Sequence, residues 1–139
     1  ILENNYVGQL GYIYDGRPFV IPITYFYDHQ NKYIICYSGD GHKINAMRKN
    51  STISLQVSEI DTVNHWKSVL VHGTFEQYFG SEAKSYLHQF SLGVKDVIME
   101  KKHVKLDFIS DFSSKIYKGD IPQVFLIKVD HMTGKKRRH

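Results

Sequence analysis

The sequence has little of what several familiar kinds of site require. It contains one cysteine, Cys36, so an intramolecular disulfide is excluded and a reducing cytoplasm is compatible with the chain. Cys36 lies inside an apolar segment, which predicts a small core residue rather than a nucleophile. No apolar run approaches the roughly 20 residues of a membrane helix, and no secretory signal is recognisable. We therefore expect a cytoplasmic protein without a membrane partner, although residues upstream of Ile1 could be missing.

Motifs for metal and hydrolytic sites are absent as well. The eight histidines stand at positions 29, 42, 65, 72, 88, 103, 131 and 139, and no two of them are two to four residues apart. The sequence has no HExxH and no CxxC pattern, so we predict no metal site. It has no Gly-x-Ser-x-Gly elbow and no local pair of carboxylates, so no catalytic residue can be named.

The sequence also has little excess charge. Its formal net charge is +4, and the closing run of residues 135–138 supplies four basic side chains. Without these four residues the basic and acidic residues balance, at 14 each. This balance argues against a nucleic-acid-binding surface, and the run is typical of a solvated end.

Aromatic and β-branched residues, in contrast, are plentiful, with ten tyrosines and eight phenylalanines, and they favour a sheet. The length and composition predict one folded domain over residues 1–139. The pattern predicts six strands, at Tyr6–Tyr14, Phe19–Tyr27, Lys32–Tyr37, Ser51–Ser58, Trp66–Tyr78 and Gln123–Asp130. Asp15-Gly16 predicts a hairpin turn, and a second polar turn follows at residues 28–31. Gly73, inside the fifth strand, suggests a bulge.

Short helices are expected around this sheet. One covers about His42–Lys49, and another covers Glu82–Phe90, with Ser81 as its N-cap and Gly93 ending it. A further short helix is expected within Val94–Lys118. The fold class is therefore mainly β: a six-stranded, antiparallel, curled or closed sheet with a few flanking short helices.

The segment SGDGHKI, residues 38–44, crosses from a strand to a helix. Its glycines can adopt positive φ and expose N–H groups, and a helix N-terminus carries a positive partial charge. His42 and Lys43 fall in the first turn, where a cation is unfavourable unless an anion compensates it. A bound phosphate would supply that anion. The alternative is that Asp40 caps the helix while Lys43 points to solvent.

The fifth strand mixes residue types on one face. Alternation places Trp66, Ser68, Leu70 and His72 together, opposite Lys67, Val69 and Val71. An indole, a hydroxyl and an imidazole on one face suit either a wet end of a barrel or the wall of a site for a flat polar ligand.

Three segments in order resemble the pyridoxamine 5'-phosphate oxidase-like flavoproteins. They are DGRPFVIPITYFYD, YSGDGHKINAMRKN and HWKSVLVHGTFEQ, and the closing QVFLIKVDHMTGK extends the likeness. Within that family they are most similar to the branch of predicted flavin-nucleotide-binding and 5-nitroimidazole-resistance proteins. The resemblance implies a split β-barrel that binds FMN at the interface of a homodimer.

The resemblance also implies the contacts of that cofactor. The strand backbone at Pro22, Ile23, Thr24 and Tyr25 would run beside the isoalloxazine ring, and Tyr37 and Ser38 would approach the ribityl phosphate. His42 and Lys43 match the phosphate-binding start of the helix, and Ser68, next to Trp66, matches a polar contact to the flavin. His42 or His72 could match a histidine near the flavin in the nitroimidazole branch.

Three hypotheses follow for function. The first is an FMN-dependent oxidoreductase that reduces a small organic acceptor, such as a nitro-aromatic or quinone-like molecule. The second is a non-catalytic module of the same fold that binds FMN or haem. The third is an interaction protein that uses its basic tail on nucleic acid. Oxidation of pyridoxamine 5'-phosphate itself is not expected, because the arginine-rich and C-terminal substrate motifs of the true oxidases have no equivalent here.

Overall fold

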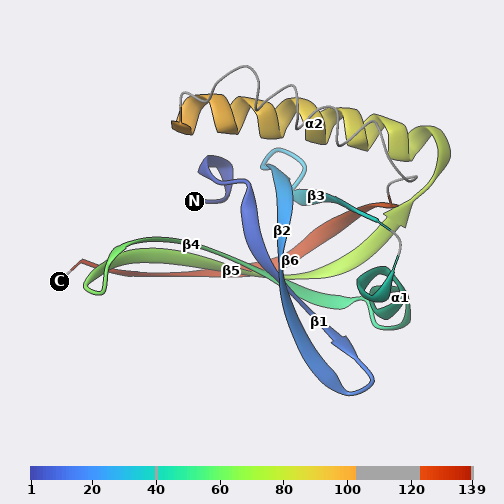
Figure 1. The fold of residues 1–139 in the computed structure, drawn as a ribbon, viewed down its shortest axis with the longest axis horizontal. Coiled ribbons are helices and arrows are strands. Elements are labelled where there is room, and N and C mark those ends of the chain that lie inside the picture. The colour runs from blue at the N-terminus through green and yellow to red at the C-terminus, as the bar shows by residue number, and fades with distance from the viewer. Residues whose placement is uncertain (40, 103–122, 139) are drawn as a thin grey trace.

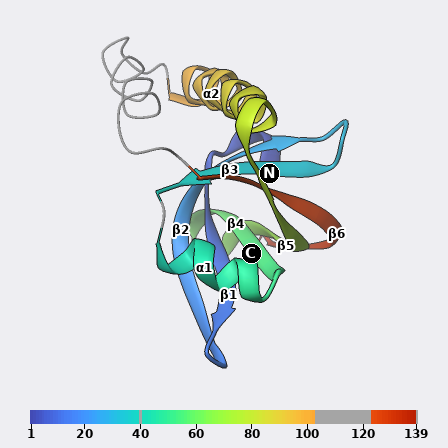
Figure 2. The same ribbon diagram turned by 90° about the vertical axis from the view of Figure 1, so that its right-hand side faces the viewer.

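The computed structural model describes residues 1–39, 41–102 and 123–138. Within them, six antiparallel strands follow one another around a barrel in the order β1-β2-β3-β6-β5-β4, which confirms the predicted fold class. The elements are η1 (Leu2–Asn4), β1 (Val7–Tyr14), β2 (Arg17–Asp28), β3 (Tyr33–Ser38), α1 (His42–Lys49), β4 (Thr52–Thr62), β5 (His65–Tyr78), α2 (Gly80–Lys102) and β6 (Gln123–Arg137). The helix α2 lies across one side of the sheet, whereas α1 lies on the opposite side (Figures 1 and 2).

Both predicted turns are confirmed. Asp15 and Gly16 have φ angles of 52° and 73°, the two positive values that a tight two-residue hairpin needs. In the turn between β2 and β3, the carboxylate of Asp28 accepts hydrogen bonds from the backbone N–H groups of Gln30 and Asn31. These local bonds hold the turn in the conformation that joins β2 to β3.

Three strands extend beyond the barrel as an arm, which is formed by residues 58–62 of β4, 65–69 of β5 and 134–137 of β6 (Figure 1). The prediction that the basic run is a free solvated end was wrong for the backbone. Lys135, Lys136 and Arg137 pair with Ser68, Lys67 and Trp66 in a continuous ladder, although their side chains are exposed. The pairing extends because the neighbouring β5 offers unused N–H and C=O groups along its full length.

The bulge expected at Gly73 is confirmed as a register shift between His72 and Gly73 on the β5–β6 ladder. A Cβ at Gly73 would lie 2.5 Å from the Ile127 side chain and 2.6 Å from the Lys128 carbonyl oxygen. Glycine therefore lets β6 approach β5 closely where the sheet curls.

The chain builds two apolar clusters. The first fills the barrel and includes Leu10, Tyr25, Cys36, Leu55 and Phe125, all of which are essentially inaccessible to solvent. The second lies between α2 and the outer side of β3 and β6, around residues such as Ile35, Phe90 and Leu126. Cys36 is a buried free cysteine, as predicted, and its burial raises the pKa of its thiol.

Two expectations about helices were wrong. Instead of a short helix ended by Gly93 and a second one after it, α2 runs unbroken over Gly80–Lys102. Gly93 does not end the helix because its missing side chain makes room for the ring of Phe26, which a Cβ there would strike. The remainder of Val94–Lys118, from residue 103 on, lies outside the described residues. Neither described helix has the length and apolar composition needed to cross a membrane.

The barrel is split between β2 and β3. Only residues 25–28 of β2 pair with β3, whereas residues 17–24 of β2 pair with β1 alone. On its other edge β3 pairs with β6 along its whole length. The Tyr25 N–H donates to the Tyr6 carbonyl, so Tyr25 and every second residue before it in β2 direct their backbone groups toward β1. The residues between them, 18, 20, 22 and 24, direct their backbone groups away from β1. Pro18 and Pro22 stand on this open edge, where a missing N–H costs no ladder hydrogen bond.

Candidate functional site

The helix α1 begins at His42, as predicted, and its first turn contains no acidic residue. Gly41 is the N-cap, with φ +155° in a region that favours glycine, and its carbonyl accepts the Asn45 N–H. No side chain caps this helix from the N-cap position, and the predicted capping role of Asp40 falls outside the described residues. An added Cβ at Gly39 or Gly41 would meet nothing within 4 Å, so open space adjoins the backbone here.

Lys43 is the cation left available at this helix start. Its residue is half-buried, and it makes none of the hydrogen bonds or ion pairs found within the described parts of the chain. A lysine at the positive end of a helix dipole is repelled by its surroundings unless an anion is present. The local electrostatics therefore suit an anionic group at Lys43.

His42, in contrast, is held by aromatic residues of the β1–β2 hairpin. Its Nδ1 lies 3.1 Å from the hydroxyl of Tyr12. Its ring lies 4.3 Å from that of Tyr14 and 4.9 Å from that of Phe19, between ring centroids. Burial raises the pKa of Tyr12, so its hydroxyl keeps its proton.

The predicted ring-binding strand contributes mainly backbone. The side chains of Ile23 and Tyr25 point into the barrel, and the Tyr25 hydroxyl donates to the Leu2 carbonyl at 2.9 Å. Burial raises the pKa of Tyr25 strongly. Pro22 and Thr24 have their backbone groups on the open edge described above. This edge offers the Thr24 N–H and the Pro22 carbonyl to a ligand.

Tyr37 and Ser38 end β3 beside the split. The Tyr37 ring packs edge-on against Phe90 of α2, with centroids 5.2 Å apart, and burial raises the pKa of its phenol. Ser38 is buried, and its hydroxyl donates to the Gly39 carbonyl at 3.0 Å. The Tyr37 ring is thus held by α2, and the Ser38 hydroxyl proton is used within the chain.

The face predicted for β5 is confirmed by its register. Trp66, Ser68, Leu70 and His72 pair with outward residues of β4, whereas Val69 and Val71 pack on the barrel core. All four outward residues are half-buried. The His72 ring stacks on that of His131 at 4.7 Å, and its Nδ1 lies 3.2 Å from the Ser54 hydroxyl. Trp66 lines a hollow of about 330 Å³ together with basic and acidic residues of the arm.

The predicted site residues thus fall into two groups in one chain. The split group surrounds the β2–β3 split and the start of α1, and the β5 group contains Trp66 and Ser68. His42 contacts Tyr12. Because Gly11 pairs with Ser54, the next residue, Tyr12, lies at the level of Ile53 on β4. Trp66 pairs with Ile60 of the same strand. Seven residues along β4 separate these levels, or about 23 Å at about 3.3 Å per residue. His42 and Trp66 are therefore far apart within one copy, whereas Thr24 pairs with Val7 and, on the continued β1–β4 register, lies level with Ser58 and Ser68.

The outer face of β1, β2, β4 and β5 carries no charged side chain between the two groups. Its members alternate with the core residues and are Val7, Gln9, Gly11, Ile13, Pro18, Val20, Pro22, Thr24, Ser54, Gln56, Ser58, Ser68, Leu70 and His72. Val20 is 68% exposed. We call this the uncharged face.

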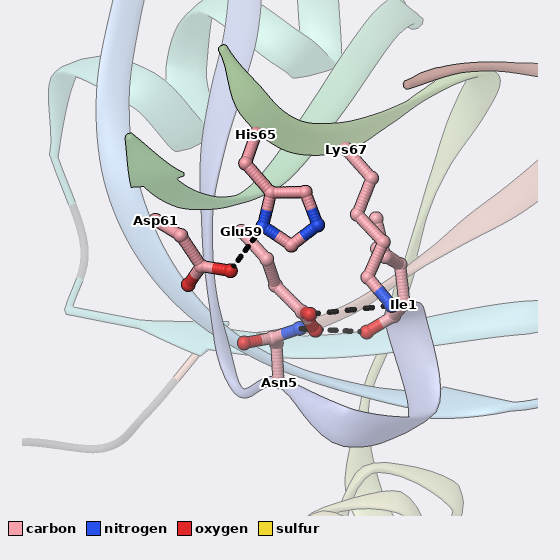
Figure 3. Close-up of polar contacts among 6 residues, drawn as sticks. All are labelled: Ile1, Asn5, Glu59, Asp61, His65 and Lys67. Atoms are coloured by element: carbon pink, nitrogen blue, oxygen red, sulfur yellow. Dashed lines mark hydrogen bonds and ion pairs between the residues drawn. The ribbon is translucent and has the colours of Figure 1, made fainter. Parts of the chain in front are cut away.

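Sequence reasoning missed the contacts that fix the arm. Glu59 lies between Asn5 and Lys67, accepting a hydrogen bond of 2.7 Å from the Asn5 amide and pairing with Lys67 at 3.4 Å (Figure 3). The same Asn5 amide donates to the Ile1 carbonyl. These contacts tie the arm's inner side, opposite Trp66, to the N-terminal turn. No local sequence signal indicates them, because Asn5 and Glu59 are 54 positions apart.

The aromatic residues around His42 were also missed. Tyr12 and Phe19 are directly paired across the β1–β2 hairpin, and their rings stack at 5.5 Å. The alternation of Tyr12 and Tyr14 before Asp15-Gly16 would have placed both on one face, but their meeting with α1 depends on the complete fold. Among the described residues, no three histidine, cysteine or carboxylate side chains gather as metal ligands.

Comparison with known proteins identifies the family. The sequence profile described as pyridoxamine 5'-phosphate oxidase matches residues 1–136, nearly the whole chain. The chain belongs to the pyridoxamine 5'-phosphate oxidase family. An uncharacterised protein of Rhizobium meliloti strain 1021 is 31% identical over 134 residues, covering 87% of this chain and 78% of its own. The resemblance inferred from the three segments is therefore confirmed.

Solved structures of similar proteins share the split-barrel fold. An FAD-binding protein of Mesorhizobium loti has a TM-score of 0.75 and 25% identity, over 100% of this chain and 90% of its own. A candidate 5-nitroimidazole antibiotic resistance protein of Bacteroides thetaiotaomicron has a TM-score of 0.59 and 19% identity, over 96% and 78% of the two chains. The pyridoxamine 5'-phosphate oxidase-like architecture thus places this chain among flavoprotein folds.

Proposed function

We propose that this chain binds FMN in a site completed by a second copy and reduces a small organic acceptor of nitro-aromatic type in the cytoplasm. The observation that carries the proposal is Lys43 in the first turn of α1, which forms no hydrogen bond or ion pair among the described residues. The family match over residues 1–136 and the similarity to an FAD-binding protein support a flavin.

The residues present fit the phosphate end of FMN. The first turn of α1 has no acidic side chain, and the backbone at Gly39 and Gly41 borders open space. Lys43 would pair with the phosphate dianion, which would also compensate the positive helix end. FMN is preferred over FAD because these residues supply one anion site at this position, which the terminal phosphate of FMN satisfies.

The open edge of β2 suits the flavin ring. Thr24 presents an N–H there, and Pro22 presents a carbonyl. Donors and acceptors alternating along an edge match the polar rim of a flat heterocycle. The flavin supplies the electron chemistry, and the chain binds it, orients it and limits solvent around it. This division agrees with the lack of a cluster of acid–base side chains among the described site residues.

A second copy is proposed because Trp66 lies about 23 Å along β4 from the level of His42. In a two-fold dimer joined through the uncharged face, Trp66 and Ser68 of one copy would approach the split group of the other. A symmetric interface uses the same patch on both copies, and the uncharged face is such a self-compatible patch. Each dimer would then hold two equivalent flavin sites.

Titration of the purified protein with FMN tests the binding step. We expect visible absorption and quenched flavin fluorescence on binding, and bleaching with a reduced nicotinamide followed by re-oxidation with a nitro-aromatic acceptor. Lys43→Ala should weaken FMN binding about 10- to 100-fold, since a charged hydrogen bond is lost.

Lys49→Ala is the matched control, because Lys49 lies at the other end of α1 over the ring of Tyr14. It should bind FMN like the unaltered chain. A chain that binds haemin but not FMN would contradict the proposal, as would Lys43→Ala without effect on affinity.

Co-expression of two variants tests the two-copy site. Lys43→Ala and Trp66→Ala homodimers should each bind FMN weakly, because every site lacks one partner. In a mixed dimer one site lacks both the Lys43 and the Trp66 side chains, whereas the other site has both. One tight FMN site per dimer should therefore return. No recovery in the mixed dimer would place both groups in the same copy and reject the arrangement.

A further inference from the structure

The contact between Tyr12 and His42 joins the barrel to the start of α1. Tyr12 is only 5% exposed, and its ring is fixed by a stacked contact with Phe19 at 5.5 Å and 10°. Its hydroxyl lies 3.1 Å from Nδ1 of His42, the first residue of α1. No other hydrogen-bond partner of either group occurs within the described residues.

This contact determines which ring nitrogen of His42 carries the proton. A buried hydroxyl proton needs an acceptor, and leaving it unsatisfied costs about 1–3 kcal/mol. Nδ1 is the acceptor that the described residues offer. A neutral imidazole that accepts at Nδ1 carries its proton at Nε2, because it has one donor and one acceptor nitrogen. Burial raises the pKa of Tyr12, so the hydroxyl remains a donor at neutral and mildly alkaline pH.

The surrounding rings keep the imidazole in this orientation. Tyr14 and Phe19 lie 4.3 and 4.9 Å from it, at interplanar angles of 56° and 64°. The two ring nitrogens project in divergent directions, so Nε2 is directed away from the Tyr12 hydroxyl. The residue as a whole is exposed despite these contacts, so its free nitrogen is accessible to a ligand.

We infer that Tyr12 is a positioning residue that holds His42 with its Nε2–H available to the phosphate of the bound flavin nucleotide. This inference rests on the proposed function and deepens it. His42 and Lys43 would then contact the phosphate as a pair, with the histidine orientation set from inside the barrel. Tyr12 itself would not touch the cofactor.

Comparison of FMN with riboflavin, which lacks the phosphate, separates this role from a general structural one. Tyr12→Phe keeps the stacked ring and removes the hydroxyl, and it should weaken FMN binding about tenfold while leaving riboflavin binding unchanged. Tyr14→Phe is the matched control, since Tyr14 touches the same imidazole through its ring alone among the described contacts. It should bind both flavins like the unaltered chain. Nitrogen NMR should show His42 protonated at Nε2 in the unaltered chain and in mixed tautomers in Tyr12→Phe.

The outcomes are distinct. Equal weakening of FMN and riboflavin in Tyr12→Phe, or no weakening, would overturn the inference and leave the proposed function standing. A His42 tautomer that is the same in Tyr12→Phe and the unaltered chain would also overturn it. If the unaltered chain binds neither flavin, the proposed function fails, and the inference fails with it.

Discussion

Two outer surfaces of the same barrel differ in what covers them. Over β3 and β6 lies α2, and the residues beneath it are large and apolar or aromatic, including Ile35, Tyr37 and Leu126 (Figure 2). The uncharged face on β1, β2, β4 and β5 has no described helix over it, and its residues are small or uncharged, such as Gly11, Ser54 and Gln56.

The difference teaches that lack of charge alone does not indicate a helix-covered surface. A helix needs wide apolar contacts, and α2 even uses Gly93 to accept Phe26. A solvent-facing sheet normally alternates its core residues with charged ones, but the uncharged face has none. Short side chains without charge suit close approach of a second sheet, which is the basis for assigning this face to a second copy.

Weakening the contact between α2 and the sheet tests the helix-covered surface and should have the largest effect. Phe90 is 0% exposed beneath α2, so Phe90→Ala should lower the free energy of unfolding by about 3–5 kcal/mol. On the same helix Leu92 is 51% exposed, and Leu92→Ala should change it by less than about 0.5 kcal/mol. Urea denaturation of both variants provides the measurement. Equal losses of unfolding free energy in the two variants would show that the Phe90 side of α2 does not hold the helix on the sheet.

A charge on the uncharged face tests the other half. Leu70→Glu places a carboxylate in the middle of the proposed interface, twice per dimer, and should raise the dimer dissociation constant by at least about 100-fold. The monomer should stay folded, because the side chain faces outward. Analytical ultracentrifugation measures the change, with Leu92→Glu on the outer side of α2 as the control. A Leu70→Glu protein as dimeric as this control would exclude the face as an interface.

The smallest effect concerns the link between the β2–β3 turn and α2. Partial burial raises the pKa of Asp28, but hydrogen bonds from Asn31, Gln89 and Gln30 outweigh it, so the pKa lies below its ordinary value of 3.8. The carboxylate therefore contributes stability above the unfolded-state pKa, and this contribution is lost as the pH falls through the folded-state pKa.

At about pH 5 the unaltered chain should be more stable than Asp28→Asn, and thermal unfolding should show that this difference in the free energy of unfolding disappears toward about pH 2. The difference should be less than about 1 kcal/mol, because water screens the Asp28 carboxylate. Asp96→Asn, at an exposed carboxyl of α2 without a described hydrogen bond, is the control. An advantage that does not change with pH would reject the role of the Asp28 charge.

Features that depend on neighbouring residues could be predicted from the sequence, whereas features that depend on contacts between distant residues could not. Asp15-Gly16, α1 over His42–Lys49 and the bulge at Gly73 each depend on the conformation of a few adjacent residues. Gly93 was misread because its effect on a neighbouring Phe26 is invisible until α2 is docked. The length of β6 was missed because its pairing partner, β5, decides where that strand ends.

For the candidate site, the sequence correctly predicted that Lys43 lies in the first turn of α1 and which residues of β5 face outward. It did not identify Tyr12 as the partner of His42, because the two are 30 positions apart. It predicted a backbone role for Tyr25, but it did not indicate that the rings of Tyr25 and Tyr37 belong to the two apolar clusters.

The open edge of β2 has a consequence for aggregation. A strand edge with free N–H and C=O groups can template the addition of another chain, and repeated addition leads to fibrils. Pro18 and Pro22 remove two of the four outward donors on this edge, so an incoming strand could not form a continuous ladder along it. The two prolines thereby protect the open edge against the addition of another strand.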